Sequence, residues 1–193
     1  MKTAAPDFRI MWDNAYVVHH ITENDSEKGR IPDILSLCAE AGNPNRPYEF
    51  ASSTKVTFAG GGISCFAANP DNMARAKKYL SVQAICTNKV NQLAHARYLP
   101  NKAAVEQHMK KHAEILRPKF AAVQDTLNKE LGDNKDLYRW TDPKGGYFVS
   151  FYAYPGTATK IVSMCKDAGV ALTPAGASYP YGNDPDEIEI GRA

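Results

Sequence analysis

The sequence predicts an α/β protein, because short apolar runs typical of strands occur between longer stretches with the apolar spacing of helices. Residues 8–12 and 48–52 are mostly apolar and are each followed by polar residues, as in buried parallel strands whose carboxyl ends carry functional groups. Of the 193 residues, 44% are hydrophobic and 23% are charged, which is ordinary for a globular chain with one or two cores.

The first half of the chain is expected to hold three helices. An apolar patch at residues 31–41 lies between two polar loops and predicts the first helix. The second is expected at residues 69–82, with Pro70 suited to its first position. The third is expected at residues 88–99, where a proline follows and ends the pattern.

The second half reads as an α/β unit with its own core. A long amphipathic stretch at residues 102–131 predicts a helix, and Pro118 inside it predicts a kink or a split. A strand, a helix and a last strand are expected to follow, at residues 146–152, 157–168 and 170–173. The boundary between the two halves is expected near residues 90–100.

Charge and composition argue against several classes of partner. The net charge of +2 is small and evenly spread, so no nucleic-acid partner is expected. No apolar stretch approaches the roughly 20 residues that a membrane helix needs. The four cysteines show no Cys-x-x-Cys spacing and no leader precedes the first strand, so we expect a cytoplasmic protein with reduced thiols. His19 and His20 have no further ligand at a suitable spacing, so we expect no metal.

Lys55 is the residue that most narrows the function. It lies in a run of small hydroxyl residues and glycines, residues 51–62, and Asp13 stands forty-two positions upstream at the end of an apolar run. A lysine amine can form a Schiff base with an aldehyde, and an aspartate can pair with a pyridine nitrogen, which makes pyridoxal phosphate (PLP) an electron sink. Each motif is weak alone, but their order and separation together indicate a PLP site.

These motifs resemble the fold-type I PLP enzymes, the aspartate aminotransferase superfamily. The segments 1–8, 12–16 and 52–60 are similar to those of the bacterial aspartate aminotransferases that also go under the names MocR-like and alanine-glyoxylate aminotransferase. The likeness continues through four further segments, which are residues 89–93, 116–120, 143–148 and 172–176.

The resemblance implies a fold and a division of the chain. Residues 1–95 would be part of the large cofactor-binding domain, with a mixed, mostly parallel sheet, and residues 96–193 would be the small α/β C-terminal domain. Such enzymes are about twice as long as this chain, so we expect it to be their C-terminal half. We also expect a truncated end, because a sequencing adapter would encode residues 189–193 in one frame.

The resemblance also implies roles for five residues. Lys55 would carry PLP as a Schiff base and shuttle the substrate proton, which requires a partly neutral amine. Asp13 would pair with the pyridine nitrogen, and Tyr16 would donate to the cofactor's phenolic oxygen. Ser52 would bind the phosphate, with Ser64 adding a second hydroxyl. A surface lysine, a capping aspartate and a core tyrosine are the structural alternatives.

Two arginines of the family pattern have no counterpart here. Relatives carry an arginine about eight residues after the lysine, where this chain has Ile63 and Ser64 after three glycines. The glycines either let the backbone approach the phosphate or form a tight turn. Glu189 stands about where the family has its substrate-binding arginine, and Arg192 lies in an unrelated context, so no clamp role passes to it.

Transamination between an amino acid, aspartate or another acidic one, and a 2-oxo acid is the function that the resemblance implies. The full-length protein is expected to be a homodimer, and the fragment alone is expected to be nearly inactive. Two alternatives remain open at this point. One is a non-catalytic aminotransferase-like ligand-binding domain of a regulator, and the other is a PLP lyase or decarboxylase, which shares the cofactor apparatus.

Overall fold

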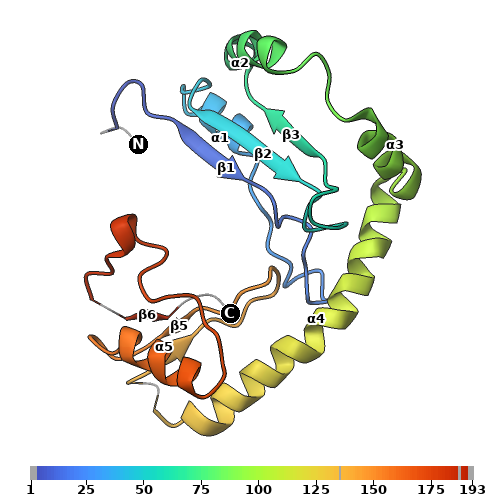
Figure 1. The fold of residues 1–193 in the computed structure, drawn as a ribbon. Helices are drawn as coiled ribbons and strands as arrows, with labels where there is room; N and C mark the ends of the chain where they lie inside the picture. Colours follow the sequence, from blue (N-terminus) through green and yellow to red (C-terminus); the bar gives the residue numbers. More distant parts are fainter. Residues whose placement is uncertain (1–3, 135, 187, 191–193) are drawn as a thin grey trace. The chain divides into compact units, whose positions relative to one another are not determined.

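The computed structural model describes residues 4–134, 136–186 and 188–190, and it confirms the α/β class (Figure 1). The chain forms two compact units. The first consists of residues 1–19 and 29–110, and the second of residues 20–28 and 111–193.

The sheet of the first unit has three strands in the order β1-β2-β3, which are β1 (Ile10–Asp13), β2 (Pro47–Ser52) and β3 (Ser64–Ala67). Strand β1 runs parallel to β2, whereas β3 runs antiparallel to β2. The expected mixed sheet is therefore present, but one of these two pairings is antiparallel, so the described sheet is not mostly parallel. The sequence did not predict β3, because four residues without apolar alternation carry little strand signal.

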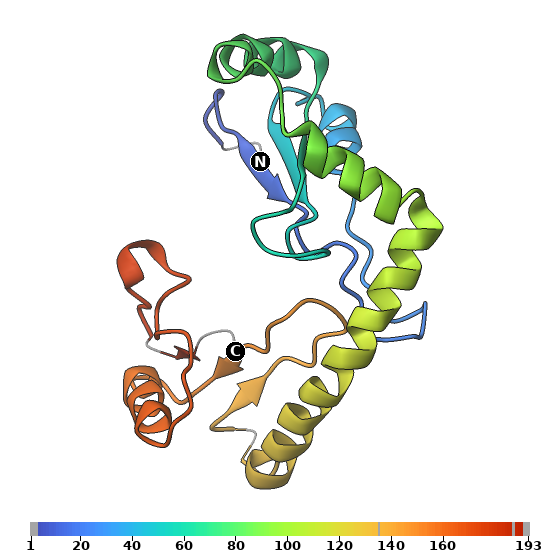
Figure 2. The ribbon, with the colours of Figure 1, turned by 45° about the vertical axis from the view of Figure 1, so that its right-hand side comes forward.

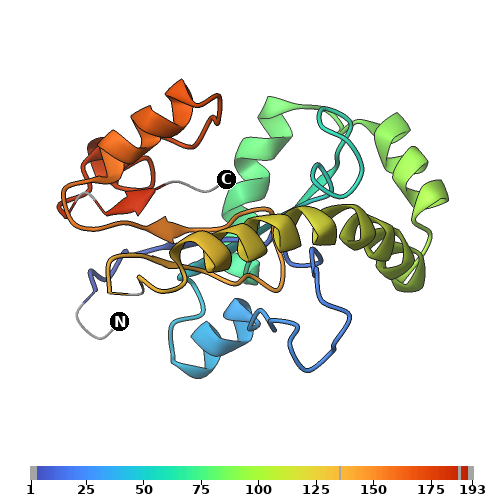
Figure 3. The ribbon, with the colours of Figure 1, turned by 90° about the horizontal axis from the view of Figure 1, so that it is seen from below.

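Helix α1 (Ile34–Glu40) starts three residues later than the sequence predicts. Asp33 sets this start, because its side chain accepts hydrogen bonds from the backbone N–H groups of Leu35 and Ser36. A hydrogen bond from the Ser36 side chain, more than any other contact, lowers the pKa of the Asp33 carboxyl. Figure 3 shows α1 on one side of the sheet and α2 on the other.

Helices α2 (Pro70–Gln83) and α3 (Lys89–Tyr98) confirm the predicted second and third helices. Both begin in the same way. The side chain of Asn69 caps α2 and that of Asn88 caps α3, each by accepting a hydrogen bond from the backbone N–H three residues later.

Helix α4 (Lys102–Leu131) is a single helix of 30 residues, which continues from the first unit into the second. Pro118 lies inside it and does not divide it, so of the predicted kink or split, the split is wrong. Proline removes one hydrogen bond, but the turns on either side continue the same amphipathic pattern. The helix ends just before Gly132, whose N–H donates to the carbonyl of Asn128.

The second unit has a sheet of three short antiparallel strands in the order β4-β5-β6 (Figure 2). They are β4 (Arg139–Trp140), β5 (Phe151–Tyr152) and β6 (Glu189–Ile190), and α5 (Ala158–Asp167) follows β5. The core of this unit is built around three buried side chains, Ala153, Ala158 and Ile190, and five partly buried ones, Phe151, Ile161, Val162, Leu172 and Ala175.

Two strand predictions in this unit need correction. Only the last two residues of the predicted strand at 146–152 are paired, and residues 170–173 form no strand, although Leu172 packs on the core. Strands β4 and β6 have two residues each, too few to show a period of two in the sequence. The predicted helix at 157–168 is confirmed as α5.

Asp184 is a charged residue that is only 9% exposed. Its carboxylate accepts hydrogen bonds from the backbone N–H groups of Asp186, Ile188 and Glu189, at 3.2, 2.8 and 2.9 Å. The buried charge thereby holds the chain where β6 begins.

Candidate functional site

Polar side chains gather where the strands of the first sheet end. Asp13 closes β1 and pairs in register with Phe50 of β2, and Ser52 of β2 pairs with Ser64 of β3. Paired residues, and residues two apart on one strand, lie on the same face of a sheet. Asp13, Ser52 and Ser64 therefore share one face at this end of the sheet.

The position of Asp13 is fixed by its own turn. Its Oδ1 atom accepts a hydrogen bond from the N–H of Ala15 at 2.9 Å, which is the Asx-turn geometry that favours aspartate after a strand. The next residue ties this turn to β2, because Asn14 donates its backbone N–H to the carbonyl of Phe50 at 2.7 Å and its side-chain amide to Glu49 Oε1 at 2.5 Å. Asp13 is exposed, so the carboxylate is accessible.

Lys55 and Tyr16 lie close together. The Nζ atom of Lys55 is 5.9 Å from the centroid of the Tyr16 ring, within the range of a cation–π contact. The edge of the Tyr16 ring in turn meets His19, at 5.3 Å between centroids. Lys55 is exposed, so its amine is accessible on a turn that follows β2.

The hydroxyl of Ser52 is bonded within the loop. Its Oγ donates to Thr54 Oγ1 at 2.8 Å and accepts from the N–H of Thr54 at 3.1 Å. Ser64, directly across the sheet from Ser52, is exposed. Thr54 is a third hydroxyl at this position that the sequence interpretation did not single out.

The glycines after Lys55 are explained by packing within the loop. A Cβ atom on Gly62 would lie 2.7 Å from both the N and the Cα of Thr54, and one on Gly61 would meet the ring of Phe58. Gly60 has a φ of +83°, which favours glycine. Of the two readings that the sequence left open, the tight turn is the one these contacts favour.

His19 is a structural side chain of this region. It is 2% exposed, and its Nε2 atom lies 3.1 Å from the carbonyl oxygen of Lys55. Within the described residues, no three His, Cys, Asp or Glu side chains gather in a way that could hold a metal ion.

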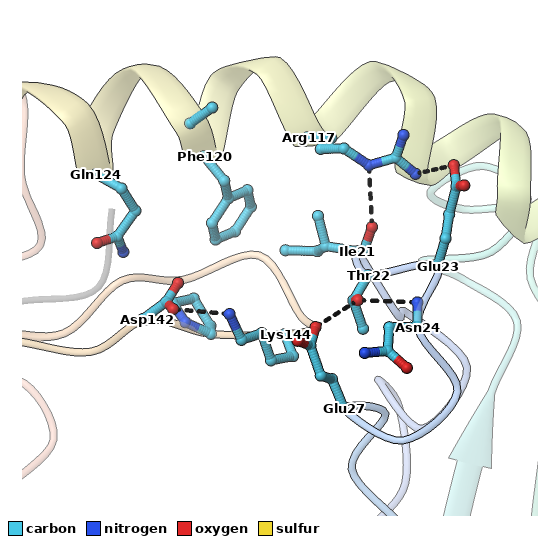
Figure 4. Close-up of a pocket in the computed structure, with 12 residues that line it drawn as sticks. Ile21, Thr22, Glu23, Asn24, Glu27, Arg117, Phe120, Gln124, Asp142 and Lys144 are labelled. Atoms are coloured by element: carbon cyan, nitrogen blue, oxygen red, sulfur yellow. Dashed lines mark hydrogen bonds and ion pairs between the residues drawn. The ribbon is translucent and has the colours of Figure 1, made fainter.

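A separate hollow of about 540 Å³ lies in the second unit (Figure 4). Its two cations already have acidic partners, since Arg117 is 2.8 Å from Glu23 and Lys144 is 2.7 Å from Asp142. The hydrogen bond to Asp142 raises the pKa of the Lys144 amine. None of the site residues predicted from the sequence is among the described residues that line this hollow.

Glu189 lies in β6 and pairs with Tyr152 of β5. Arg139 of β4 pairs with the same tyrosine, and its guanidinium lies 4.3 Å from the centroid of the Tyr152 ring. The equivalence of Glu189 to the substrate-binding arginine of the family stays a prediction from the sequence. Arg192 lies outside the described residues.

The profile of the family described as aspartate amino-transferase matches residues 1–193. The chain belongs to the aspartate aminotransferase family. A Mycolicibacterium smegmatis protein named as an aminotransferase is 49% identical over 190 residues, and a Corynebacterium glutamicum aspartate aminotransferase is 46% identical over 190 residues. These alignments cover 98% of this chain but 44% and 43% of the relatives, so the chain spans less than half of their length.

Solved structures agree with this placement in the aminotransferase family. The crystal structure of an aspartate transaminase from Corynebacterium glutamicum is 44% identical and superposes with a TM-score of 0.91 over 98% of this chain and 44% of that one. The α-aminoadipate aminotransferase of Thermus thermophilus, complexed with N-(5'-phosphopyridoxyl)-L-leucine, is 22% identical and shares the fold, with a TM-score of 0.71 over 94% of this chain and 44% of that one. The narrower MocR-like placement stays a prediction.

No helix among the described residues combines the length and the apolar composition that crossing a membrane requires.

Proposed function

We propose that the complete natural protein, meaning this sequence with any residues that lie outside it, is a PLP-dependent aminotransferase in which Lys55 holds the cofactor. The observation that carries the proposal is the proximity of Lys55 Nζ to Tyr16 beside the strand end that bears Asp13, in a chain of the aspartate aminotransferase family. When bound, PLP supplies an electron sink for the bond that breaks at the substrate Cα.

Lys55 is the proposed covalent anchor and proton carrier. Lys55 is exposed on the turn that follows β2. Its amine would therefore be accessible to both the cofactor aldehyde and the substrate Cα. In its neutral form, once substrate has displaced it from the cofactor, the Lys55 amine would take the proton from the substrate Cα and deliver it to the cofactor C4′.

Asp13 and Tyr16 are proposed to orient and polarise the cofactor ring. The Asp13 carboxylate, held by the N–H of Ala15, would pair with the pyridine nitrogen and keep it protonated. The Tyr16 hydroxyl would donate to the phenolic oxygen of the ring.

The hydroxyls of Ser52 and Ser64 are proposed to bind the phosphate, and the neighbouring Thr54 hydroxyl belongs with them. Ser52 and Ser64 sit opposite each other at the end of the sheet, and Thr54 is bonded to Ser52. Hydroxyls and loop amides are the groups that commonly cradle a phosphate where no arginine is used.

Aspartate or another acidic amino acid, with a 2-oxo acid, is the proposed substrate pair. Support comes from relatives at 46% and 44% identity that are named aspartate aminotransferase or aspartate transaminase. The fold alone does not separate transamination from lyase chemistry, because a PLP-bound C–S lyase from Staphylococcus hominis shares it with a TM-score of 0.64.

The family also underlies three wider proposals. We propose a partial large domain at residues 1–95 and a small domain at residues 96–193, a homodimer as the active assembly, and the cytoplasm as its compartment.

The activity test compares three forms of the complete protein with aspartate, 2-oxoglutarate and PLP. Wild type and the control Lys78→Ala, an exposed lysine of α2, should transaminate equally. Lys55→Ala should lose turnover while its far-ultraviolet circular dichroism stays unchanged, since an exposed side chain contributes little to packing. Wild-type turnover in Lys55→Ala would refute the assignment, and a ligand-binding domain would show no turnover in any form.

A further inference from the structure

Histidines from three different segments of the chain form hydrogen-bond contacts with the turn that carries Lys55. The turn itself is one helical turn, because the N–H groups of Val56 and Thr57 both donate to the carbonyl of Ser53 at 2.9 Å. Such a turn leaves its last carbonyls without partners inside the turn. The positions of these carbonyls therefore depend on neighbouring side chains.

Two histidines reach these carbonyls. His19, after β1, lies with Nε2 3.1 Å from the carbonyl oxygen of Lys55, and His108 of α4 lies with Nε2 2.7 Å from that of Val56. The hydroxyl of Tyr98 is 3.2 Å from His108 Nδ1. Since Nε2 must donate to the carbonyl, Nδ1 of the neutral ring accepts from this hydroxyl.

His95 of α3 contacts the hydroxyl side chains of the turn. Its Nδ1 lies 2.8 Å from the carbonyl oxygen of Asn91, so in the neutral ring this nitrogen carries the proton and Nε2 is an acceptor. The Oγ atom of Ser53 is 2.8 Å from Nε2, and the Oγ1 atom of Thr57 is 3.2 Å from it. Thr57 donates instead to the carbonyl of Ser53 at 3.1 Å. The Ser53 hydroxyl lies 3.3 Å from the carbonyl oxygen of Ile63 but 2.8 Å from His95 Nε2, so we assign its proton to the shorter contact with His95.

Ser53 also joins the two ends of the loop that runs from Ser53 to Ile63. Its Oγ accepts the N–H of Ile63 at 2.9 Å, and its own N–H donates to the carbonyl of Ile63 at 2.8 Å. The His95 ring is 9% exposed, so its bond to Ser53 is screened from water. Through Ser53, the buried imidazole of His95 is thereby linked both to the start of the Lys55 turn and to Ile63, where the loop ends.

We infer that His95, acting through Ser53, is a positioning residue that sets where the turn presents Lys55. The inference rests on the proposed role of Lys55 as the cofactor lysine. The hydrogen-bond contacts of the His95 ring go to Ser53, Thr57 and Asn91, so we expect it to act through the geometry of the turn. A displacement of about 1 Å in a reacting group is enough to lower a rate by up to about a hundredfold.

The test uses the complete protein and four variants. His95→Leu removes the acceptor, His95→Gln restores an acceptor oxygen near Nε2, Ser53→Ala removes the donor from the other side, and Arg97→Gln is an exposed control on the same helix. We measure kcat and KM for aspartate, the pyridoxyl label on Lys55 after borohydride reduction with PLP, and hydrogen exchange of residues 53–64.

We expect His95→Leu and Ser53→Ala to lower kcat at least about tenfold, with KM changed far less, and to speed exchange in residues 53–64 but not elsewhere in the first unit. His95→Gln should recover most of both, and Arg97→Gln should match wild type. Unchanged exchange and kcat in both His95→Leu and Ser53→Ala would overturn the inference. So would equal loss in His95→Gln and His95→Leu, or faster exchange throughout the unit, which would mark His95 as an ordinary core residue.

Failure of the proposed function gives a different result. A pyridoxyl label on another lysine in wild type would show that Lys55 is not the cofactor lysine. The exchange of residues 53–64 would still report whether His95 holds the turn.

Discussion

Gly62→Ala tests whether the glycines after Lys55 serve loop packing or phosphate binding. The added Cβ would lie 2.7 Å from the N and Cα atoms of Thr54. This is about 0.8 Å closer than the optimal carbon contact of roughly 3.5 Å, and backbone atoms cannot swing aside as side chains do. Overpacking of this kind typically costs about 1–3 kcal/mol, so we expect the free energy of unfolding to fall by that amount.

The chain supplies matched controls for this substitution. A Cβ on Gly29 would meet no atom within 4 Å, whereas the three atoms nearest to one on Gly61 belong to the ring of Phe58, which is 67% exposed and can move. We therefore expect the free energy of unfolding of Gly29→Ala to stay within about 0.5 kcal/mol of wild type. That of Gly61→Ala should lie between the values for Gly29→Ala and Gly62→Ala.

The assay is urea unfolding of the complete protein without PLP, followed by titration with PLP. If the glycines serve loop packing, the cofactor-free protein should lose most unfolding free energy in Gly62→Ala, less in Gly61→Ala and least in Gly29→Ala. If Gly62→Ala unfolds like wild type but binds PLP more weakly, the packing argument is refuted and the glycine serves the phosphate.

Three further predictions concern the site, a helix start and the chain by itself. Asp13→Asn in the complete protein should retain PLP but lose most turnover, because an amide cannot keep the pyridine nitrogen protonated; near wild-type kcat would make Asp13 only a turn residue. Because the pKa of Asp33 is lowered in the folded state, the stability it gives α1 is present above its unfolded pKa of about 3.9 and is lost as pH falls through the lower folded pKa. Asp33→Asn should remove that part of the pH dependence, and identical acid unfolding curves for the two proteins would contradict it. The 193 residues expressed alone with PLP should turn over aspartate and 2-oxoglutarate far below about 10 s⁻¹, and a rate near that value would show that this chain suffices.

The helices were predictable because their signals are local. Asn69 and Asn88 are capping residues directly before amphipathic stretches, and both helices start where these caps predict. Strands β3, β4 and β6 were not predictable, because two to four residues gain their structure from pairing with distant strands. The over-long strand predicted at residues 146–152 shows the converse error, in which alternation extends over seven residues but strand pairing is formed only by Phe151 and Tyr152.

The site was predictable only in part, for the same physical reason. Lys55 and Asp13 stand in recognisable local motifs, and the register of β1, β2 and β3 places Asp13, Ser52 and Ser64 on one face. The contacts that hold the Lys55 turn join residues 36 and 52 positions apart, in the cases of His19 and His108. No spacing rule in the sequence links a histidine of one segment to a backbone carbonyl of another, so these contacts required the structure.

Borohydride reduction of the complete protein with PLP, followed by peptide mapping, tests the role of Lys55 most directly. We expect a single pyridoxyl group on the peptide that contains Lys55, and its absence from that peptide in Lys55→Arg. A pyridoxyl group fixed on a different lysine, with Lys55 unmodified, would contradict it.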